Sequence, residues 1–341
     1  LPPAVWAALR LVDDRGGRAV TRTPTLSIVV TVYNMRREAP RTLRSLTPEY
    51  QGVDADTYEV IVVDNGSSEP LDEREVRSIG PNFRCLSMDR PAPSPVPAMN
   101  FGAAAARGRW LGLMIDGARI LTPGVISLAL RAVAAYDEPV VATLGFHLGP
   151  DVQYRSVARG YCQREEDRLL AQIGWPADGY RLFEISSLGG SSRFGWFLPI
   201  AESNCVFLSR GLWARLGGYD ERFAAPGGGL ANLDFYKRAC ESAGVQPVVL
   251  LGEGTFHQLH GGASTGLAAG ENERRWDADN AFYASLRGEG YRCPTRKPVF
   301  LGSVPPPAEA LLRLSLEIAE RARREGSPAP YETVERSVRP T

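Results

Sequence analysis

The sequence contains little of what defines several common protein classes. Its five cysteines form no C-x-x-C pair, and their odd number argues against a disulfide scaffold and a four-cysteine zinc site. They are Cys85, Cys162, Cys205, Cys240 and Cys293. A reducing compartment, the cytoplasm, is therefore expected. The longest apolar runs, near residues 26–32 and 248–251, are far shorter than the ~20 residues that cross a bilayer, so we expect no transmembrane segment.

The sequence also lacks an excess of either charge. Its 39 basic and 39 acidic side chains cancel, so no overall field attracts nucleic acid or an anionic membrane, and no nucleic-acid partner is expected. Hydrophobic residues make up 44% and charged residues 23%, which is typical of a folded globular protein. A chain of 341 residues buries roughly 75% of its unfolded surface, so a large core can form without disulfides.

Two nucleotide-binding motifs are missing as well. No G-x-G-x-x-G follows the first apolar run, and no G-x-x-x-x-G-K-[ST] occurs, which argues against a dinucleotide fingerprint and a P-loop. What is present is an alternation of apolar, β-branched runs with helical patterns, which predicts an α/β fold whose mainly parallel sheet is covered on both faces. Strands are expected over residues 26–32, 58–63, 83–88, 110–115, 140–146, 204–208 and 245–251. Helices are expected over residues 36–46, 98–107, 125–135, 210–216, 231–243 and 308–324.

The chain divides into three parts on these patterns. Residues 1–24 are interpreted as an N-terminal extension with a short helical pattern, residues 25–302 as the α/β domain, and residues 303–341 as a C-terminal helix and tail. Residues 151–198 show little periodicity and are interpreted as an insertion over one sheet edge, near a ligand. The prolines between residues 91 and 97 predict an extended surface segment.

Polar side chains gather where the predicted strands end. Thr31, Tyr33 and Asn34 close the first strand, Asp64 and the Asn-Gly-Ser-Ser after it close the second, and Asp116 follows the strand near residue 110. In an open parallel sheet, ligands bind at the carboxyl ends of the strands. The sequence therefore predicts a ligand site at this edge.

The motifs at these positions resemble those of the family 2 glycosyltransferases of the GT-A fold. The resemblance covers roughly residues 26–262 and is carried by residues 27–34, 62–68, 100–102, 106–108, 115–116 and 217–223. It implies a GT-A, Rossmann-like fold with a mixed, mainly parallel sheet. It also implies transfer of a sugar, with inversion, from a nucleotide-diphosphate sugar such as a UDP-, GDP- or dTDP-sugar to an acceptor hydroxyl.

The resemblance assigns nucleotide-sugar contacts to several of these residues. Asp64 would accept hydrogen bonds from the base and Tyr33 would flank it, with Thr31 and Asn34 beside them. Asp-Asn-Gly-Ser is also a good turn sequence by itself, which is the alternative for Asp64. Asn100 would contact the donor or else cap the helix that it opens.

A divalent metal, Mn²⁺ or Mg²⁺, is implied near Asp116. Such enzymes usually hold it with an Asp-x-Asp pair after a strand, but here Ala118 replaces the second carboxylate. Either Asp116 and a histidine of a late loop hold the metal, or Arg119 neutralises the diphosphate directly. His257 is the favoured ligand and His260 the alternate, because residues three apart in an extended segment face opposite ways.

The resemblance also implies a catalytic base, and here the sequence departs from the pattern. Asn232 stands where the family has the basic carboxylate, and an amide cannot take a proton. Asp234 is the candidate base, with Glu184 and Glu202 as alternatives, or Asp234 is only a residue near a helix N-terminus. Aromatic rings for stacking on an acceptor sugar are expected from Tyr180, Trp196 and Phe197.

Two functions are therefore open. The first is a glycosyltransferase acting on a saccharide or another hydroxyl acceptor in polysaccharide, glycoconjugate or natural-product glycosylation. The second is a catalytically impaired module that binds a nucleotide sugar and partners another enzyme, since both departures fall on catalytic residues.

Overall fold

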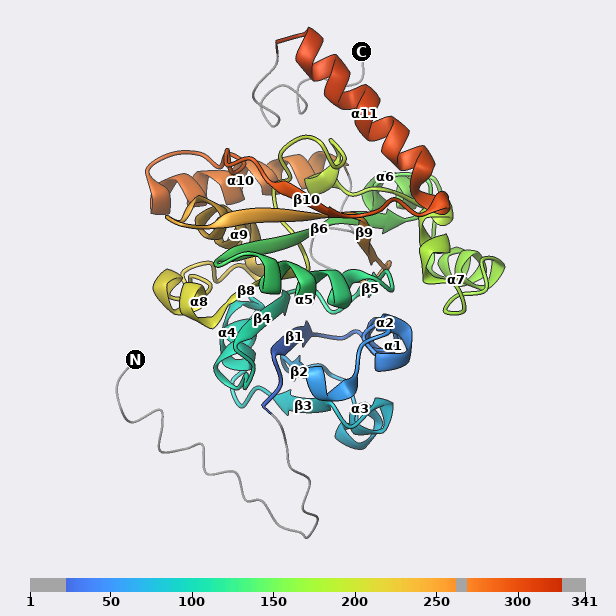
Figure 1. Ribbon diagram of the computed structural model, residues 1–341, viewed down its shortest axis with the longest axis vertical. Helices are drawn as coiled ribbons and strands as arrows, with labels where there is room; N and C mark the ends of the chain where they lie inside the picture. The colour runs from blue at the N-terminus through green and yellow to red at the C-terminus, as the bar shows by residue number, and fades with distance from the viewer. Residues whose placement is uncertain (1–22, 262–268, 327–341) are drawn as a thin grey trace.

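The apolar runs form strands of one mixed sheet, in the order β10-β9-β6-β8-β4-β1-β2-β3. The computed structural model describes residues 23–261 and 269–326 (Figure 1). The strands on this path are β1 (Leu26–Val32), β2 (Tyr58–Asp64), β3 (Phe83–Ser87), β4 (Trp110–Met114), β6 (Pro139–Leu148), β8 (Val206–Ser209), β9 (Gln246–His257) and β10 (Val299–Gly302). Two short strands lie off it: β5 (Arg119–Leu121) pairs with β9, and β7 (Ser186–Leu188) pairs with β6.

The pairing of the strands is mainly parallel. Strands β3, β2, β1 and β4 are parallel to one another, as are β6, β9 and β10. Strand β8 joins these two groups and is antiparallel to both of its neighbours, β4 and β6. The predicted GT-A class, a mixed and mainly parallel sheet, is confirmed.

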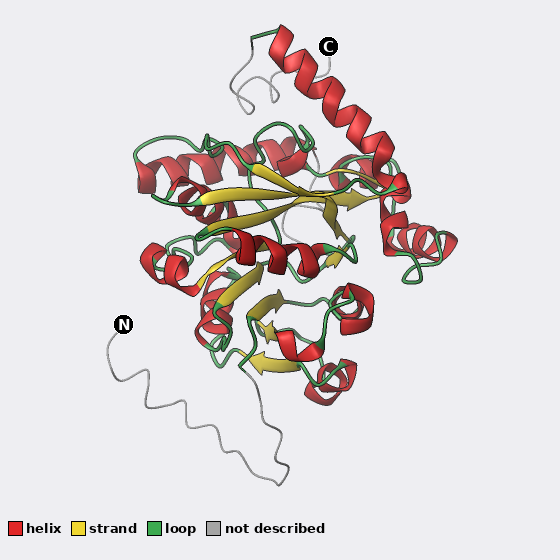
Figure 2. Ribbon diagram, in the orientation of Figure 1, coloured by secondary structure: helices red, strands yellow, loops and turns green. Residues whose placement is uncertain are grey.

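Consecutive residues of the central strands pack on opposite faces of the sheet. In β1, Ile28 and Val30 belong to one hydrophobic cluster and Val29 to the other, and all three are fully buried. This alternation follows from the two-residue period of a strand. Helices α1 (Ala39–Arg44), α3 (Glu73–Ile79) and α5 (Val125–Ala135) contribute to the first cluster, and α4 (Val96–Ala104), α8 (Arg210–Leu216) and α9 (Ala231–Glu241) to the second. Figure 2 shows helices on both sides of the strands.

Further helices surround this core. They are α2 (Pro48–Gln51), α6 (Gln153–Ala158), α7 (Gln163–Gln172), α10 (Ala269–Arg287) and α11 (Glu309–Arg324). Figure 1 shows α6 and α7 beyond the carboxyl end of β6, and α11 at the opposite end of the molecule from β3. Among the described residues, no helix combines the length and the apolarity that crossing a bilayer requires.

Several predicted elements differ from the structure. Helix α4 begins at Val96, with Pro97 in its first turn, where proline is tolerated because the first N–H groups have no partner within the helix. The extended segment predicted across these prolines is therefore too long, and Asn100 lies inside the helix instead of opening it. The insertion predicted at residues 151–198 contains α6, α7 and β7. The helical pattern in residues 1–24 and most of the C-terminal tail lie outside the described residues.

A buried carboxylate ties the middle of the sheet to the segment after α4. Glu59 is 1% exposed and accepts hydrogen bonds from the Ser27 hydroxyl at 2.6 Å, the Arg107 backbone N–H at 2.8 Å and Arg84 Nε at 3.0 Å. Burial acts to raise the pKa of Glu59, but these hydrogen bonds and the charge of Arg84 outweigh it, so the pKa is lowered.

We therefore expect Glu59→Gln to lower the free energy of unfolding by about 2 kcal/mol at pH 7. Because the folded pKa lies below its ordinary value of 4.5, the stabilisation is present above that pH and is lost as the pH falls through the folded pKa. Urea denaturation at pH 7 and below pH 4 measures the difference, which narrows in acid. Glu73→Gln, at an exposed pair with Arg77, is the control and leaves stability nearly unchanged. If the difference in the free energy of unfolding between wild type and Glu59→Gln does not change with pH, ionised Glu59 is not the source of this stabilisation.

Candidate active site

A cavity of about 680 Å³ opens at the carboxyl ends of β1, β4 and β9. Its size is within the range of small-molecule sites. The segments that follow these three strands line it, with Thr31, Tyr33 and Asn34 after β1, Asp116 after β4 and His260 after β9. The polar strand ends that the sequence predicted to share one edge therefore meet there.

Asp116 occupies the tight turn between β4 and β5. Its Oδ1 accepts a hydrogen bond from the Ala118 N–H at 3.0 Å, and its Oδ2 accepts one from Arg119 Nε at 2.9 Å. The turn lies against β1, and a Cβ at Gly117 would come within 2.6 Å of the Thr31 carbonyl oxygen, so only glycine fits there. Ala118 is fully buried, and its carbonyl accepts from the Gln258 N–H.

Both late histidines reach this carboxylate. His257 Nε2 lies 3.0 Å from Asp116 Oδ2, His260 Nε2 lies 3.7 Å from Asp116 Oδ1, and the two Nε2 atoms are 3.1 Å apart. The prediction that only one histidine faces the site is wrong. Strand β9 ends at His257, so the extended geometry on which that prediction rested does not continue to His260.

The protonation states of His257 and Asp116 are suited to the binding of a cation. Burial, together with the charge of Arg119, lowers the pKa of His257 to about 4, so its ring is neutral at pH 7. Burial acts to raise the pKa of Asp116, but the charge of the Arg119 guanidinium beside it acts in the opposite direction, and this pKa lies well below its usual range. A carboxylate and imidazole nitrogens whose ligand atoms lie within 4.8 Å of one another are a donor set that fits a divalent metal.

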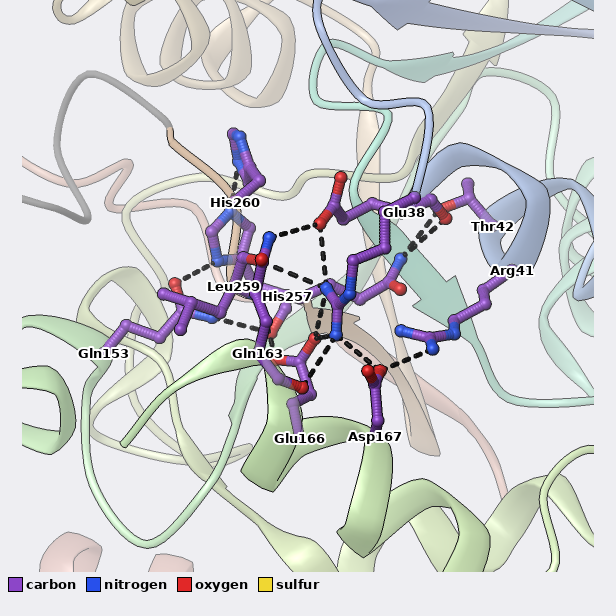
Figure 3. A network of polar contacts seen from close by, with 12 residues as sticks. Glu38, Arg41, Thr42, Gln153, Gln163, Glu166, Asp167, His257, Leu259 and His260 are labelled. Carbon is purple, nitrogen blue, oxygen red and sulfur yellow. Dashed lines mark hydrogen bonds and ion pairs between the residues drawn. The ribbon is translucent and has the colours of Figure 1, made fainter. Parts of the chain in front are cut away.

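Gln153 sets the orientation of His257. Its Oε1 lies 2.6 Å from His257 Nδ1, and its Nε2 donates to the His257 carbonyl oxygen at 3.0 Å (Figure 3). Because an amide oxygen can only accept, Nδ1 carries the proton and the lone pair of Nε2 faces Asp116. The backbone N–H of Gln153 donates to Nδ1 of His147, a partner that explains this third histidine structurally.

A charged network holds the loop that carries His260. The Leu259 N–H donates to Glu166 Oε2 at 2.7 Å, and its carbonyl accepts from Gln163 at 3.2 Å and from Arg37 at 3.3 Å (Figure 3). Glu166 is fully buried and lies on α7, so the segment that the sequence analysis interpreted as an insertion near a ligand positions the histidines. No local pattern in the sequence points to these residues, because the network joins segments that are far apart in the chain.

The residues predicted to hold the nucleotide fall into two groups. Thr31, Tyr33, Asn34, Asp116 and Arg119 line the cavity, whereas Asp64 and Asn100 do not. Tyr33 is 54% exposed, and its ring is available for contact with a flat ligand. Asn34 has a φ of 52° and accepts a hydrogen bond from the Ser68 N–H, and Thr31 donates its hydroxyl to the Ile115 carbonyl oxygen.

Asp64 combines the two interpretations made for it. Its Oδ1 accepts hydrogen bonds from the N–H groups of Gly66 at 2.9 Å and Ser67 at 2.8 Å, which is a local turn. Its Oδ2 is buried and has no hydrogen-bond partner among the described residues. The next residue, Asn65, lines the cavity. The turn uses one oxygen of this carboxylate, Oδ1, and leaves Oδ2 without a hydrogen bond within the described chain.

Asn100 has structural partners instead. Its Oδ1 accepts from the Tyr219 N–H at 3.1 Å, and its Nδ2 donates to the Tyr219 carbonyl oxygen and to Glu221. The amide thus joins α4 to the segment after α8. Neither of the two roles predicted for Asn100, a helix cap and a donor contact, has support in this geometry.

Asp234 is placed where a proton acceptor is of little use. It is 1% exposed on α9, does not line the cavity, and binds Arg238 Nε at 2.7 Å and Arg287 Nε at 2.7 Å. Both of its oxygens accept from arginine, so the geometry argues against its predicted role as catalytic base. Glu184, which pairs with Arg181, does not line the cavity either.

Two other carboxylates of the described chain do line the cavity, Glu202 and Asp279. Asp279 lies on α10, in a stretch where the sequence analysis predicted no element, and burial raises its pKa.

The aromatic residues at the cavity are Tyr33, Tyr154 and Trp276. The predicted Tyr180, Trp196 and Phe197 are not among them: Tyr180 binds Glu253, Trp196 is 1% exposed in the core, and Phe197 packs on Phe300.

Comparison with known proteins decides the family. Residues 27–188 match the model of Glycosyl transferase family 2. The chain carries a family 2 glycosyltransferase domain. Over 185 residues it is 32% identical to the succinoglycan biosynthesis protein ExoO of Rhizobium meliloti (strain 1021), an alignment that covers 54% of this chain and 49% of that protein. The chain therefore spans about half the length of this curated relative.

The glycosyltransferase domain also has similar solved structures. One is residues 1–349 of S. aureus TarS, which is 13% identical with a TM-score of 0.49, covering 77% of this chain and 74% of the other. Another is the mannosyltransferase PcManGT from Pyrobaculum calidifontis, solved with GDP-Man and Mn²⁺, which is 16% identical with a TM-score of 0.46 and covers 93% and 79%. Both TM-scores are below 0.5, so the family assignment depends on the sequence match.

Proposed function

We propose that this glycosyltransferase domain transfers a sugar, with inversion, from a nucleotide-diphosphate sugar to an acceptor hydroxyl in the cavity at the carboxyl ends of the strands. The observation that carries the proposal is the convergence of Asp116, His257 and His260 beside Arg119 in that cavity. The relationship to ExoO supports a saccharide acceptor in polysaccharide synthesis. All five cysteines are free, which supports action in a reducing compartment, the cytoplasm.

Asp116, His257 and His260 would hold the divalent metal in this proposal. Two imidazole donors favour Mn²⁺ over Mg²⁺, which prefers oxygen ligands. Bound there, the metal would neutralise the negative charge that develops on the diphosphate as it leaves. Arg119 lies against the same carboxylate and lines the cavity, so its guanidinium would add positive charge at the phosphates without replacing the metal.

Asp64 and Tyr33 would hold the base of the nucleotide. The unused Oδ2 of Asp64 is an acceptor for a ring N–H such as those of uracil, thymine and guanine. A buried acceptor without a partner is costly, and a ligand that supplies the missing donor removes that cost. Tyr33 is the exposed aromatic ring at the same strand ends.

Nucleotide binding is tested by thermal unfolding with UDP, GDP or dTDP in the presence of Mn²⁺. We expect a rise in the melting temperature, because the ligand binds only the folded state. Asp64→Asn keeps Oδ1 for the Gly66 and Ser67 N–H groups but turns Oδ2 into a donor. The variant is expected to have the wild-type melting temperature without ligand and at least a tenfold weaker affinity for the nucleotide. If none of these nucleotides shifts the wild-type melting temperature, the proposal fails.

The alternative, a nucleotide-sugar-binding module without turnover, also has an observation in its favour. Asn232 occupies the position of the family's base, and Asp234 is held by two arginines. Release of nucleoside diphosphate from UDP-glucose, UDP-GlcNAc or GDP-mannose separates the two functions, since the module would bind the donor and release nothing.

A further inference from the structure

The amide that replaces the expected base is fixed against another acid. Asn232 lies in the first turn of α9, is 6% exposed and lines the cavity. Its Nδ2 donates to Glu202 Oε2 at 2.7 Å and to the Ser203 carbonyl oxygen at 3.2 Å, while its Oδ1 accepts from the Tyr219 hydroxyl at 2.7 Å. The orientation of the amide is therefore determined, with its N–H groups toward Glu202.

Glu202 is held in place but keeps a free oxygen. It is half-buried, lines the cavity, and among the described residues nothing donates a hydrogen bond to its Oε1. The next residue is pinned to β6, since the Ser203 hydroxyl donates to the Thr143 carbonyl oxygen and accepts from the Thr143 N–H. General-base catalysis needs a proton acceptor on a fixed backbone at the cavity, with one oxygen oriented by an amide and the other without a donor partner among the described residues.

We propose that Glu202 is the catalytic base of this domain and that Asn232 is its positioning residue; this inference rests on the proposed function. The acid then lies in the segment before β8 instead of on α9, and the amide of Asn232 on α9 orients it. A carboxylate that is hydrogen-bonded to the residue at the family's base position can serve the same part of the cavity.

The reaction balances with this one base. The acceptor oxygen forms a bond to the anomeric carbon while its proton passes to a carboxylate oxygen of Glu202. The bond between the anomeric carbon and the diphosphate oxygen breaks, and its electron pair leaves on the nucleoside diphosphate. A single displacement inverts the anomeric centre, and protonated Glu202 later gives its proton to water.

The other carboxylates of the described cavity are less suited. Asp116 belongs to the cluster with His257 and His260, where its charge is needed for the cation. Asp279 is paired with Arg275, whose Nε lies 3.6 Å from its Oδ2. Neither of them is bonded to Asn232.

An exchange of the two side chains tests the proposal. Wild type, Glu202→Gln and the double variant Glu202→Gln with Asn232→Asp are compared, using UDP-glucose, UDP-GlcNAc and GDP-mannose with Mn²⁺ as donors and water or methyl β-D-glucoside as acceptor. Glu202→Gln removes the base but keeps the shape, and is expected to lower nucleoside diphosphate release about 10²–10⁴-fold. The double variant restores one carboxylate and one amide in exchanged positions, and is expected to recover at least about tenfold of that loss.

The thermal shift with UDP or GDP and Mn²⁺ is measured on the same samples and is expected to be unchanged in all of them. Glu184→Gln, outside the cavity, is the matched control with full activity, and Asp279→Asn is expected to lose less than about tenfold. Release that persists in Glu202→Gln, or that is lost only in Asp279→Asn, overturns the assignment of Glu202 and leaves the proposed function intact. If the wild type binds the nucleotide but releases no nucleoside diphosphate, Glu202 is not a catalytic base and the domain is a binding module. If the wild type binds none of these nucleotides, the proposed function itself is wrong.

Discussion

Asp116→Asn is expected to abolish the binding of Mn²⁺ at the site and to lower nucleoside diphosphate release about 10³-fold. The carboxylate is the one anionic ligand of the cluster with His257 and His260, and it also pairs with Arg119. Asparagine keeps the acceptor that holds the turn at Ala118, so the fold is retained while the charge is lost. The variant leaves the two histidines in place, but two imidazoles without a carboxylate bind Mn²⁺ weakly, because Mn²⁺ suits oxygen ligands.

Calorimetric titration of Mn²⁺ in the presence of UDP or GDP measures the first effect, and release from the donor panel measures the second. Chelation of the metal in wild type is expected to reproduce the low release of the variant. Glu165→Gln, on the exposed side of α7 and paired with Arg168, is the control. Unchanged Mn²⁺ affinity in Asp116→Asn would show that the metal lies elsewhere.

Asp234→Asn is expected to lower the free energy of unfolding by about 3 kcal/mol while leaving the nucleotide-induced thermal shift intact. The carboxylate is buried between Arg238 of its own helix and Arg287 of α10. Asparagine removes the counter-charge of Arg238 and one of the two carboxylates that pair with Arg287, which keeps Asp220. The two arginine side chains are 25% and 21% exposed, which limits the loss to the lower end of the range for buried pairs. The residue predicted from the sequence as a catalyst is in this view a link between α9 and α10.

Urea denaturation measures this loss, and the release rate is compared under conditions where the variant is fully folded. Glu289→Gln, at an exposed glutamate 3.6 Å from Lys237, is the control and is expected to leave stability nearly unchanged. An Asp234→Asn variant as stable as wild type but without turnover would return the role of base to Asp234.

Local sequence patterns were sufficient to predict several of the regular elements. The strand over residues 26–32 and the helices over residues 125–135 and 210–216 have the predicted bounds, because a β-branched run and an apolar stripe each determine the backbone conformation within a few residues. The short strands β5, β7 and β10 were not predicted, since three or four residues carry no periodicity. They are strands because a neighbour pairs with them, as β5 pairs with β9 through Arg119 and His257.

The candidate site was likewise predictable only in part from local sequence patterns. The sequence alone determined the α/β class and the strand ends where Tyr33, Asn34 and Asp116 meet, because parallel strands place their carboxyl ends at one edge. Only the tertiary structure decided which acids are available for chemistry. Asp234 and Glu202 are both carboxylates near α9, but one is neutralised by an arginine from α10 and the other faces the cavity beside an amide. A side chain's proton affinity and access depend on groups brought in from distant parts of the chain, and local sequence does not contain them.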